Sequence, residues 1–234
     1  MTIEGWIDFA KGPLFALTFL IMILGLLRHF IIQVYQLLTG KGRRLRRAPW
    51  KTIVLDALSW VFPIKHLIKG TIFFSAVSFL FHIGVIIVPL FLADHIVLWN
   101  NFLGANLPAI GQSLADYLTL FTIACLLVLL VFRVFSARHR AMSRKTDYIL
   151  LLVILTTFTA GYLASHPKVN FMSWETAMLI HLLSAEFLFV LIPFTKLAHI
   201  VLFVFDRISA VHWQLRPGSG DKVAKAIYGE EVHI

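Results

Sequence analysis

Cysteine is almost absent from this chain of 234 residues, which holds only Cys125. One cysteine excludes an intrachain disulfide framework, and it cannot supply the ligands of an iron–sulfur cluster or of a cysteine-based zinc site. Cys125 lies inside an apolar run, where we expect it to be a small packing side chain. Iron–sulfur chemistry connected with this chain would have to reside in a partner.

Charge is also scarce, since 14% of the residues are charged and 59% are hydrophobic. Soluble domains average about 25% charged residues. Several apolar runs are longer than about 18 residues, the length that indicates a membrane span. The formal net charge is +9, but the basic residues stand beside the apolar runs. This arrangement is typical of membrane topology signals and argues against nucleic acid as a partner.

Five apolar runs predict five membrane-spanning helices, because only helices and closed barrels satisfy every backbone group in lipid. The fold class we expect is an all-α integral membrane bundle formed by residues 1–216. It includes an amphipathic interfacial segment at about 52–69, and a cytoplasmic tail, 217–234, follows it. No secretory signal precedes the first run, which is expected to be retained. The predicted spans are Pro13–Leu38, Gly70–Trp99, Asp116–Phe135, Tyr148–Ala164 and Ala177–Phe205.

Basic residues mark one side of the predicted bundle. They gather between the first and second spans, between the third and fourth spans, and in the tail, whereas 100–115 carries no charge. Positive loops face the cytoplasm. We therefore expect the N-terminus outside and the C-terminus in the cytoplasm, which requires an odd number of spans.

Histidine is abundant, with ten copies. An ionisable side chain within a span is costly and usually functional. Four histidines lie well within the predicted spans, namely His82, His95, His181 and His199. The remaining six fall at span ends, interfaces or loops, where no special role is expected: His29, His66, His139, His166, His212 and His233.

The spacing of the four histidines suggests two cofactor sites. His181 and His199 are 18 residues apart, which on an unbroken helix places them on one face and about 27 Å apart. Antiparallel spans then pair His82 with His199 on the inner side and His95 with His181 on the outer side. One imidazole from each of two helices can ligate haem iron. Hydrogen-bonded interhelical histidines are the alternative, and the 13 residues from His82 to His95 rotate the second by about 140° unless Pro89 distorts the helix.

Three segments carry a family resemblance: HLLSAEFLFVLIPFTKLAHIVLFVFDRISAVHWQLR from His181, FHIG at Phe81–Gly84, and ARHRAMSRKTDYILLLVI from Ala137. With them the chain resembles, over roughly Trp6–Arg216, the gamma subunit of membrane-bound respiratory nitrate reductase. That subunit is a five-helix dihaem cytochrome b. The longer basic and amphipathic insert looks more like cytochrome b subunits of heterodisulfide-reductase-like and sulfate-reducer membrane complexes, which leaves the terminal substrate open.

The resemblance implies two haem b groups. It makes His82 and His199 the ligands of the inner haem and His181 a ligand of the outer haem. The family's spacing predicts Leu92 as the fourth ligand, and leucine cannot bind iron. Either His95 replaces it after a local rewinding of the helix, or only the inner haem is present.

The resemblance also implies a place in a respiratory complex of a bacterial or archaeal cytoplasmic membrane. The chain would oxidise quinol, or reduce quinone, with menaquinone or ubiquinone as substrate. Its partners would be an iron–sulfur subunit, a catalytic subunit and membrane lipid.

Charged residues near the predicted haems are further candidates. Quinol oxidation requires a proton acceptor, for which Asp94 is preferred over Asp116 and Glu175 because it adjoins His95. Three cations at the inner level are candidate haem-propionate partners, namely Lys196, Arg133 and Arg138. Glu186 is an intramembrane acid without an assigned role, and Gly84 is expected to permit close approach of a haem or a helix.

Two other function classes fit the same composition. A proton or ion transporter subunit would use the histidines and carboxylates as ion sites, although the chain shows no internal repeat. A haem-free membrane anchor for a peripheral enzyme would need none of them. Haem content separates these classes from a cytochrome b.

Overall fold

The computed structural model describes residues 2–39, 51, 55, 72–200 and 202–203. The chain divides into two units, Met1–Met22 with Leu67–Leu191 and Ile23–His66 with Ile192–Ile234, and each is described by itself. Apart from Lys51 and Leu55, the basic cluster after the first span, the predicted amphipathic segment 52–69 and the tail 217–234 lie outside the described residues.

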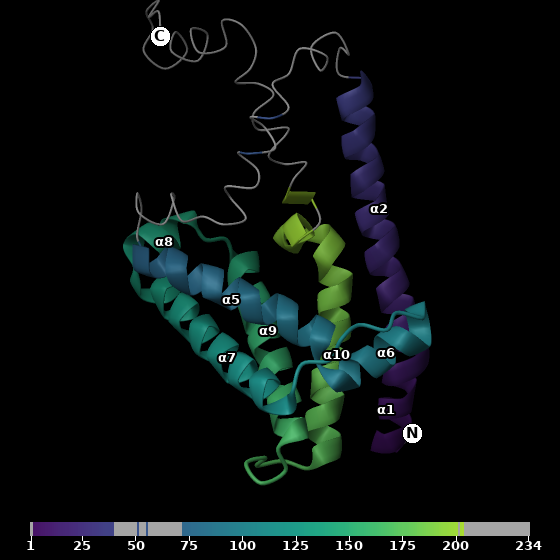
Figure 1. The fold of residues 1–234 in the computed structure, drawn as a ribbon. Helices are drawn as coiled ribbons and strands as arrows, with labels where there is room; N and C mark the ends of the chain where they lie inside the picture. Colours follow the sequence, from purple (N-terminus) through teal and green to yellow (C-terminus); the bar gives the residue numbers. More distant parts are fainter. Residues whose placement is uncertain (1, 40–50, 52–54, 56–71, 201, 204–234) are drawn as a thin grey trace, which may run out of the picture. The chain divides into compact units, whose positions relative to one another are not determined.

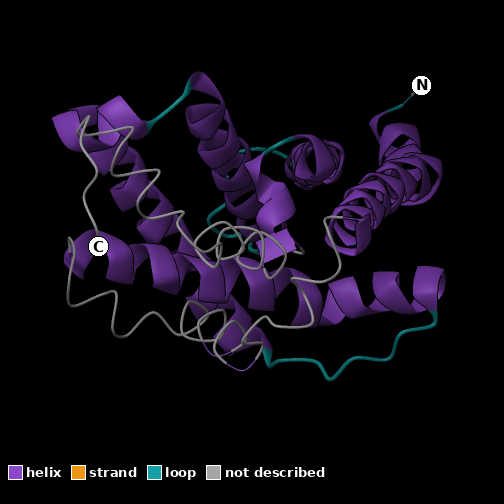
Figure 2. Ribbon diagram, turned by 90° about the horizontal axis from the view of Figure 1, so that it is seen from above, coloured by secondary structure: helices purple, strands orange, loops and turns teal. Residues whose placement is uncertain are grey.

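Regular structure in the described residues is helical, joined by short loops (Figures 1 and 2). The order is α1 (Ile3–Phe9), the π-helical turn η1 (Ala10–Leu14), α2 (Phe15–Thr39), α5 (Ile72–Phe91), α6 (Ala93–Leu103), α7 (Gln112–Phe135), α8 (Ala137–Met142), α9 (Lys145–Ser165), α10 (Trp174–Phe194) and the 3-10 turn η3 (Lys196–Ala198).

Five helical segments in the described residues are long and apolar enough to cross a membrane. This confirms the predicted number of spans and the all-helical, multi-pass character of the chain. Their bounds are Ile3–Tyr35, Ile72–Phe91, Gln112–Phe135, Lys145–Ser165 and Trp174–Phe194. The predicted bounds are wrong at three places, each with a cause in backbone chemistry.

The first span begins at Ile3, ten residues before the predicted start at Pro13. Thr2 caps its N-terminus by accepting the N–H of Gly5 at 3.3 Å. Pro13 lies inside η1. Because proline has no N–H, it cannot donate to the carbonyl four residues earlier, and here a widened π turn carries the helix past it.

The second span is not one helix from Gly70 to Trp99. It breaks at Leu92, whose φ of −65° and ψ of 134° are those of extended backbone. Leu92 forms an isolated bridge with Ile110, and the Ile110 N–H donates to Phe91 O at 3.0 Å. Pro89 removes a helical hydrogen bond in the last turn of α5, and the segment before α7 supplies a donor to the broken end.

The fifth span also breaks, at Thr195, where φ is −130° and ψ is −175°. The prediction of one helix over Ala177–Phe205 is therefore wrong. The argument that His181 and His199 share one face fails with it, because it assumed an unbroken helix.

Within the second unit, α2 supports the backbone near that break. The carbonyl of Pro193 accepts the Nε2–H of His29 at 2.7 Å. One turn earlier on α2, a Cβ on Gly25 would overlap the Pro193 ring. Glycine allows α2 to approach closely enough for His29 to reach the carbonyl, a role the sequence did not indicate.

In the first unit, α7 packs between α5 and α9 (Figure 1). Gly84 lies where α5 meets α7, and a Cβ there would overlap Thr122 Oγ1. Thr122 is fully buried, and its hydroxyl donates to Leu118 O at 2.6 Å. Gly84 was expected to allow the close approach of a haem or of a helix. In the described structure it allows the close approach of helix α7.

Candidate functional site

His95 and His181 lie against each other in the first unit. Their ring centroids are 6.0 Å apart, and the ring planes differ by 4°. His95 is the third residue of α6, and His181 lies in the N-terminal half of α10. The break at Leu92 makes this possible, because the rotation expected along an unbroken helix does not apply.

Backbone carbonyls hold both rings by the same atom. His95 Nδ1 is 3.1 Å from Pro89 O, and His181 Nδ1 is 2.9 Å from Thr157 O on α9. The indole N–H of Trp99 also donates to Pro89 O at 3.1 Å. Pro89 is among the last four residues of α5, whose carbonyls lack helical partners. The broken helix end thus becomes the acceptor that orients His95.

These hydrogen bonds leave one nitrogen of each ring for ligation. A carbonyl only accepts, so each Nδ1 carries a proton and, in the neutral ring, each Nε2 keeps its lone pair. The pair therefore offers two imidazoles from two helices, each with an Nε2 lone pair, which is the kind and number of protein ligands that a haem iron takes.

Gly161 leaves the space that the His181 ring occupies. A Cβ on this α9 residue would lie 2.8 Å from His181 Nδ1 and 2.9 Å from its Cε1. Only glycine leaves room for the ring while Thr157, one turn earlier, accepts its proton. The sequence analysis missed Gly161, Thr157 and Trp99, because their roles depend on contacts between helices.

A search for clusters of three or more possible metal-ligating side chains finds none in the described residues. Haem iron needs only two axial ligands from protein, since the porphyrin supplies four nitrogens. This result therefore bears on bare metal ions and leaves a haem site untested.

His82 and His199, the predicted inner pair, belong to different units, so their mutual distance is not described. His82 is half-buried, and its Nδ1 is 2.6 Å from Ser78 O. His199 follows η3, is exposed, and its Nδ1 is 2.5 Å from Lys196 O. In both, as in the outer pair, Nδ1 lies at a backbone carbonyl.

The predicted charged candidates are mostly at the surface of the described structure. Asp94 is exposed in the first turn of α6. Arg138 on α8 and Lys196 on η3 are also exposed. Glu175 lies in the first turn of α10, and Asp116 contacts a histidine described below.

Arg133 instead takes part in the corner formed by α7, α8 and α9. Its Nη1 donates to Ser143 Oγ at 2.9 Å and lies 3.8 Å from Asp147 Oδ2. Its carbonyl accepts the hydroxyl proton of Tyr148 at 2.9 Å. These contacts give Arg133 a structural role, and its proposed contact with a propionate stays a prediction.

Glu186 is the most buried acid in the described residues, with 3% of its surface exposed. Its two carboxylate oxygens have no hydrogen-bond partner in that part of the chain. Five residues rotate an α-helix by about 140° from the starting side, so Glu186 does not share the side of α10 that carries His181.

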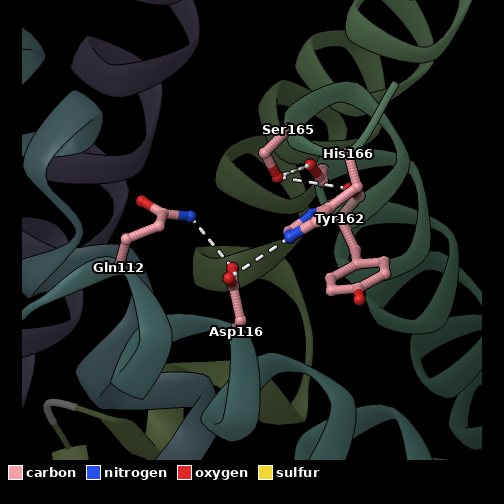
Figure 3. A network of polar contacts seen from close by, with 6 residues as sticks. Gln112, Asp116, Tyr162, Ser165 and His166 are labelled. Atoms are coloured by element: carbon pink, nitrogen blue, oxygen red, sulfur yellow. Dashed lines mark hydrogen bonds and ion pairs between the residues drawn. The ribbon is translucent and has the colours of Figure 1, made fainter. Parts of the chain in front are cut away.

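Two histidines for which no role was expected make specific contacts. His139 packs on Phe74 with centroids 4.2 Å apart, and its Nδ1 is 2.8 Å from Ser136 Oγ. His166, at the end of α9, contacts Asp116 of α7 (Figure 3). The structure places His139 in the short helix α8 and His166 at the C-cap of α9, and both make contacts beyond solvent.

A comparison with known proteins gives a sequence match. A curated protein from Nitratidesulfovibrio vulgaris is 33% identical over 208 residues, covering 85% of this chain and 89% of that protein. The chain belongs to the same family. The printed name of the relative, "Protein", states no activity, so membership carries no function with it. No family model matches the chain, and no solved structure matches it.

Proposed function

We propose that this chain is the membrane-anchoring cytochrome b subunit of a respiratory redox complex. It would exchange electrons between the quinone pool and a partner iron–sulfur subunit through two b-type haems. The observation that carries the proposal is the pairing of His95 with His181, parallel and 6.0 Å apart, each with Nδ1 at a backbone carbonyl. Carbonyl partners of this kind orient metal-binding histidines.

His95 and His181 would hold the outer haem by their Nε2 atoms, and His82 and His199 the inner haem. A haem bound in this way supplies one-electron transfer and has no open iron position for oxygen. Lys196, Arg133 and Arg138 are the proposed propionate partners. As cations, their side chains would form charge-assisted hydrogen bonds with these carboxylates.

Asp94 is the proposed proton acceptor for quinol, because it is exposed and precedes His95. The N-terminus would lie outside a bacterial or archaeal cytoplasmic membrane and the C-terminus inside. The chain would act as the quinol-oxidising or quinone-reducing subunit, with menaquinone or ubiquinone, and would leave the terminal substrate to a catalytic subunit.

A haem spectrum tests this function against a haem-free anchor and against a transporter subunit. We expect the purified full-length protein to show a b-type spectrum when the dithionite-reduced and oxidised states are compared, with two haems per chain by quantitation. A chain without haem b contradicts the proposal. One haem per chain would contradict the arrangement with two haems.

Gly161→Ala is expected to disturb the outer site alone. The new Cβ would lie 2.8 Å from His181 Nδ1, so the ring must shift and its bond to Thr157 O must weaken. One of the two haem potentials should change, or one haem should be lost, in a redox titration of the purified variant. Gly111→Ala is the matched control, because nothing lies within 4 Å of its added Cβ. Equal behaviour of the two variants would contradict the positioning role.

A further inference from the structure

Asp116 and His166 form a pair that joins two spans of the first unit (Figure 3). Asp116 lies near the start of α7, and His166 is the C-cap of α9. His166 Nε2 is 3.2 Å from Asp116 Oδ2. The other carboxylate oxygen, Oδ1, accepts the side-chain amide of Gln112 at 2.9 Å.

The contacts of the pair suit it to pass a proton. His166 Nδ1 is 2.9 Å from Tyr162 O, and a carbonyl only accepts, so Nδ1 carries its own hydrogen. A bond between Nε2 and Oδ2 then needs a second hydrogen, either on the imidazole or on the carboxyl group. The Nε2–Oδ2 contact is therefore a place where the pair can take up and release one exchangeable proton.

The pair lies further along α9 than the residues that position His181. Along α9, His166 follows Gly161 by five residues and Thr157 by nine, which corresponds to about 8 Å and 14 Å of helix. Both residues position His181. Each side chain of the pair is 26% exposed. Gln112 also lies two residues after Ile110, which is bonded to the α5 end beside Leu92.

The ionisable side chains described in contact with His166 are Asp116 from α7 and Tyr162 from its own helix. The Tyr162 ring stacks on the imidazole with centroids 4.1 Å apart. Histidine is the side chain that changes charge between pH 5 and 8, which suits it to pass protons.

We infer that the Asp116–His166 pair is the proton relay of the quinol site, carrying protons from quinol to the outer water. This inference rests on the proposed function. Oxidation of quinol to quinone breaks two O–H bonds and releases two protons and two electrons, and the haems proposed above would accept the electrons one at a time. Each released proton, passed on by the first acceptor, forms an N–H bond at His166 Nε2 facing Asp116. It then leaves to water before the next proton arrives.

The first test follows the proton itself. In the full-length protein with ¹⁵N-labelled histidine, in lipid nanodiscs, we expect the NMR signal of His166 Nε2 to report its carboxylate partner at 3.2 Å. Asp116→Asn should shift that signal, because an amide replaces the carboxylate beside the ring nitrogen. An unchanged His166 signal in that variant would overturn the inference, whatever the haem content.

The second test follows electron entry in the haem-loaded protein. Asp116→Asn and His166→Gln should each slow quinol-driven haem reduction by about 100-fold, within the range of a lost proton-transfer group. Reduction by dithionite should be unchanged, since it requires no proton from quinol. Tyr117→Phe is the control, because it neighbours Asp116 on α7 and is 74% exposed.

The outcomes separate the two proposals. Unchanged quinol rates, or an equal loss of quinol and dithionite rates, would overturn the relay. A wild-type protein that binds no haem would overturn the proposed function, and the relay role with it. A wild-type protein reduced by quinol, with variants slowed only in that reaction, supports both.

Discussion

His181→Ala is expected to lower the haem content of the purified protein from two to one per chain. The lost imidazole faces His95 at a centroid distance of 6.0 Å, and no other histidine ring contact is described for His95. A haem with one protein ligand and an enlarged cavity is held weakly. His95→Ala should give the same loss, and the double variant should lose no more, because the two residues act as one site.

His139→Ala is the control for these variants. His139 is also half-buried with a hydrogen-bonded Nδ1, but it packs on Phe74 and has no proposed ligand role. It should keep both haems. Two haems persisting in His181→Ala, or a haem lost from His139→Ala, would show that the outer site is assigned wrongly.

Gly84→Ala is expected to destabilise the contact between α5 and α7. Its Cβ would overlap Thr122 Oγ1, and it would lie 3.1 Å from Thr122 Cβ and 3.3 Å from Leu118 O. The latter is helix backbone and cannot move aside like a flexible side chain. Overpacking of this kind costs about 1–3 kcal/mol, and the cost should appear as a lower thermal midpoint in detergent.

Two further variants make that prediction specific. Gly12→Ala adds the same methyl group where nothing lies within 4 Å and should change the midpoint little. Thr122→Ala removes the overlapping hydroxyl, so the double variant Gly84→Ala/Thr122→Ala should recover part of the loss. Equal midpoints for the Gly84 and Gly12 variants would refute the close-packing argument.

The number of spans could be predicted because it depends on length and hydropathy alone. Five apolar runs are too long for ordinary core helices, and five helices suited to a membrane are found in the described structure. The bounds could not be predicted so well. Pro13, Pro89 and Pro193 all lie within helical segments, yet the first is absorbed by a π turn and the other two precede breaks at Leu92 and Thr195.

The histidines show the same difference between what the sequence predicts and what only the structure reveals. The sequence indicated His95 as a ligand candidate from its position within the second apolar run. On an unbroken helix, however, it would lie about 140° around the helix from His82. The break at Leu92 removes that objection, and it exists partly because Ile110 donates to Phe91 O. That donor lies 19 residues further along the chain, so no local pattern could reveal it.

The sequence by itself determined that this is a helical, multi-pass chain and which histidines lie within its apolar runs. These properties follow from composition and from the cost of placing polar groups in lipid. Only the tertiary structure decided which rings meet, because that depends on helix breaks, on glycines such as Gly84 and Gly161 that allow close approach, and on carbonyls that helix ends leave free. The tertiary structure therefore decided that His95 pairs with His181 and that Asp116 pairs with His166.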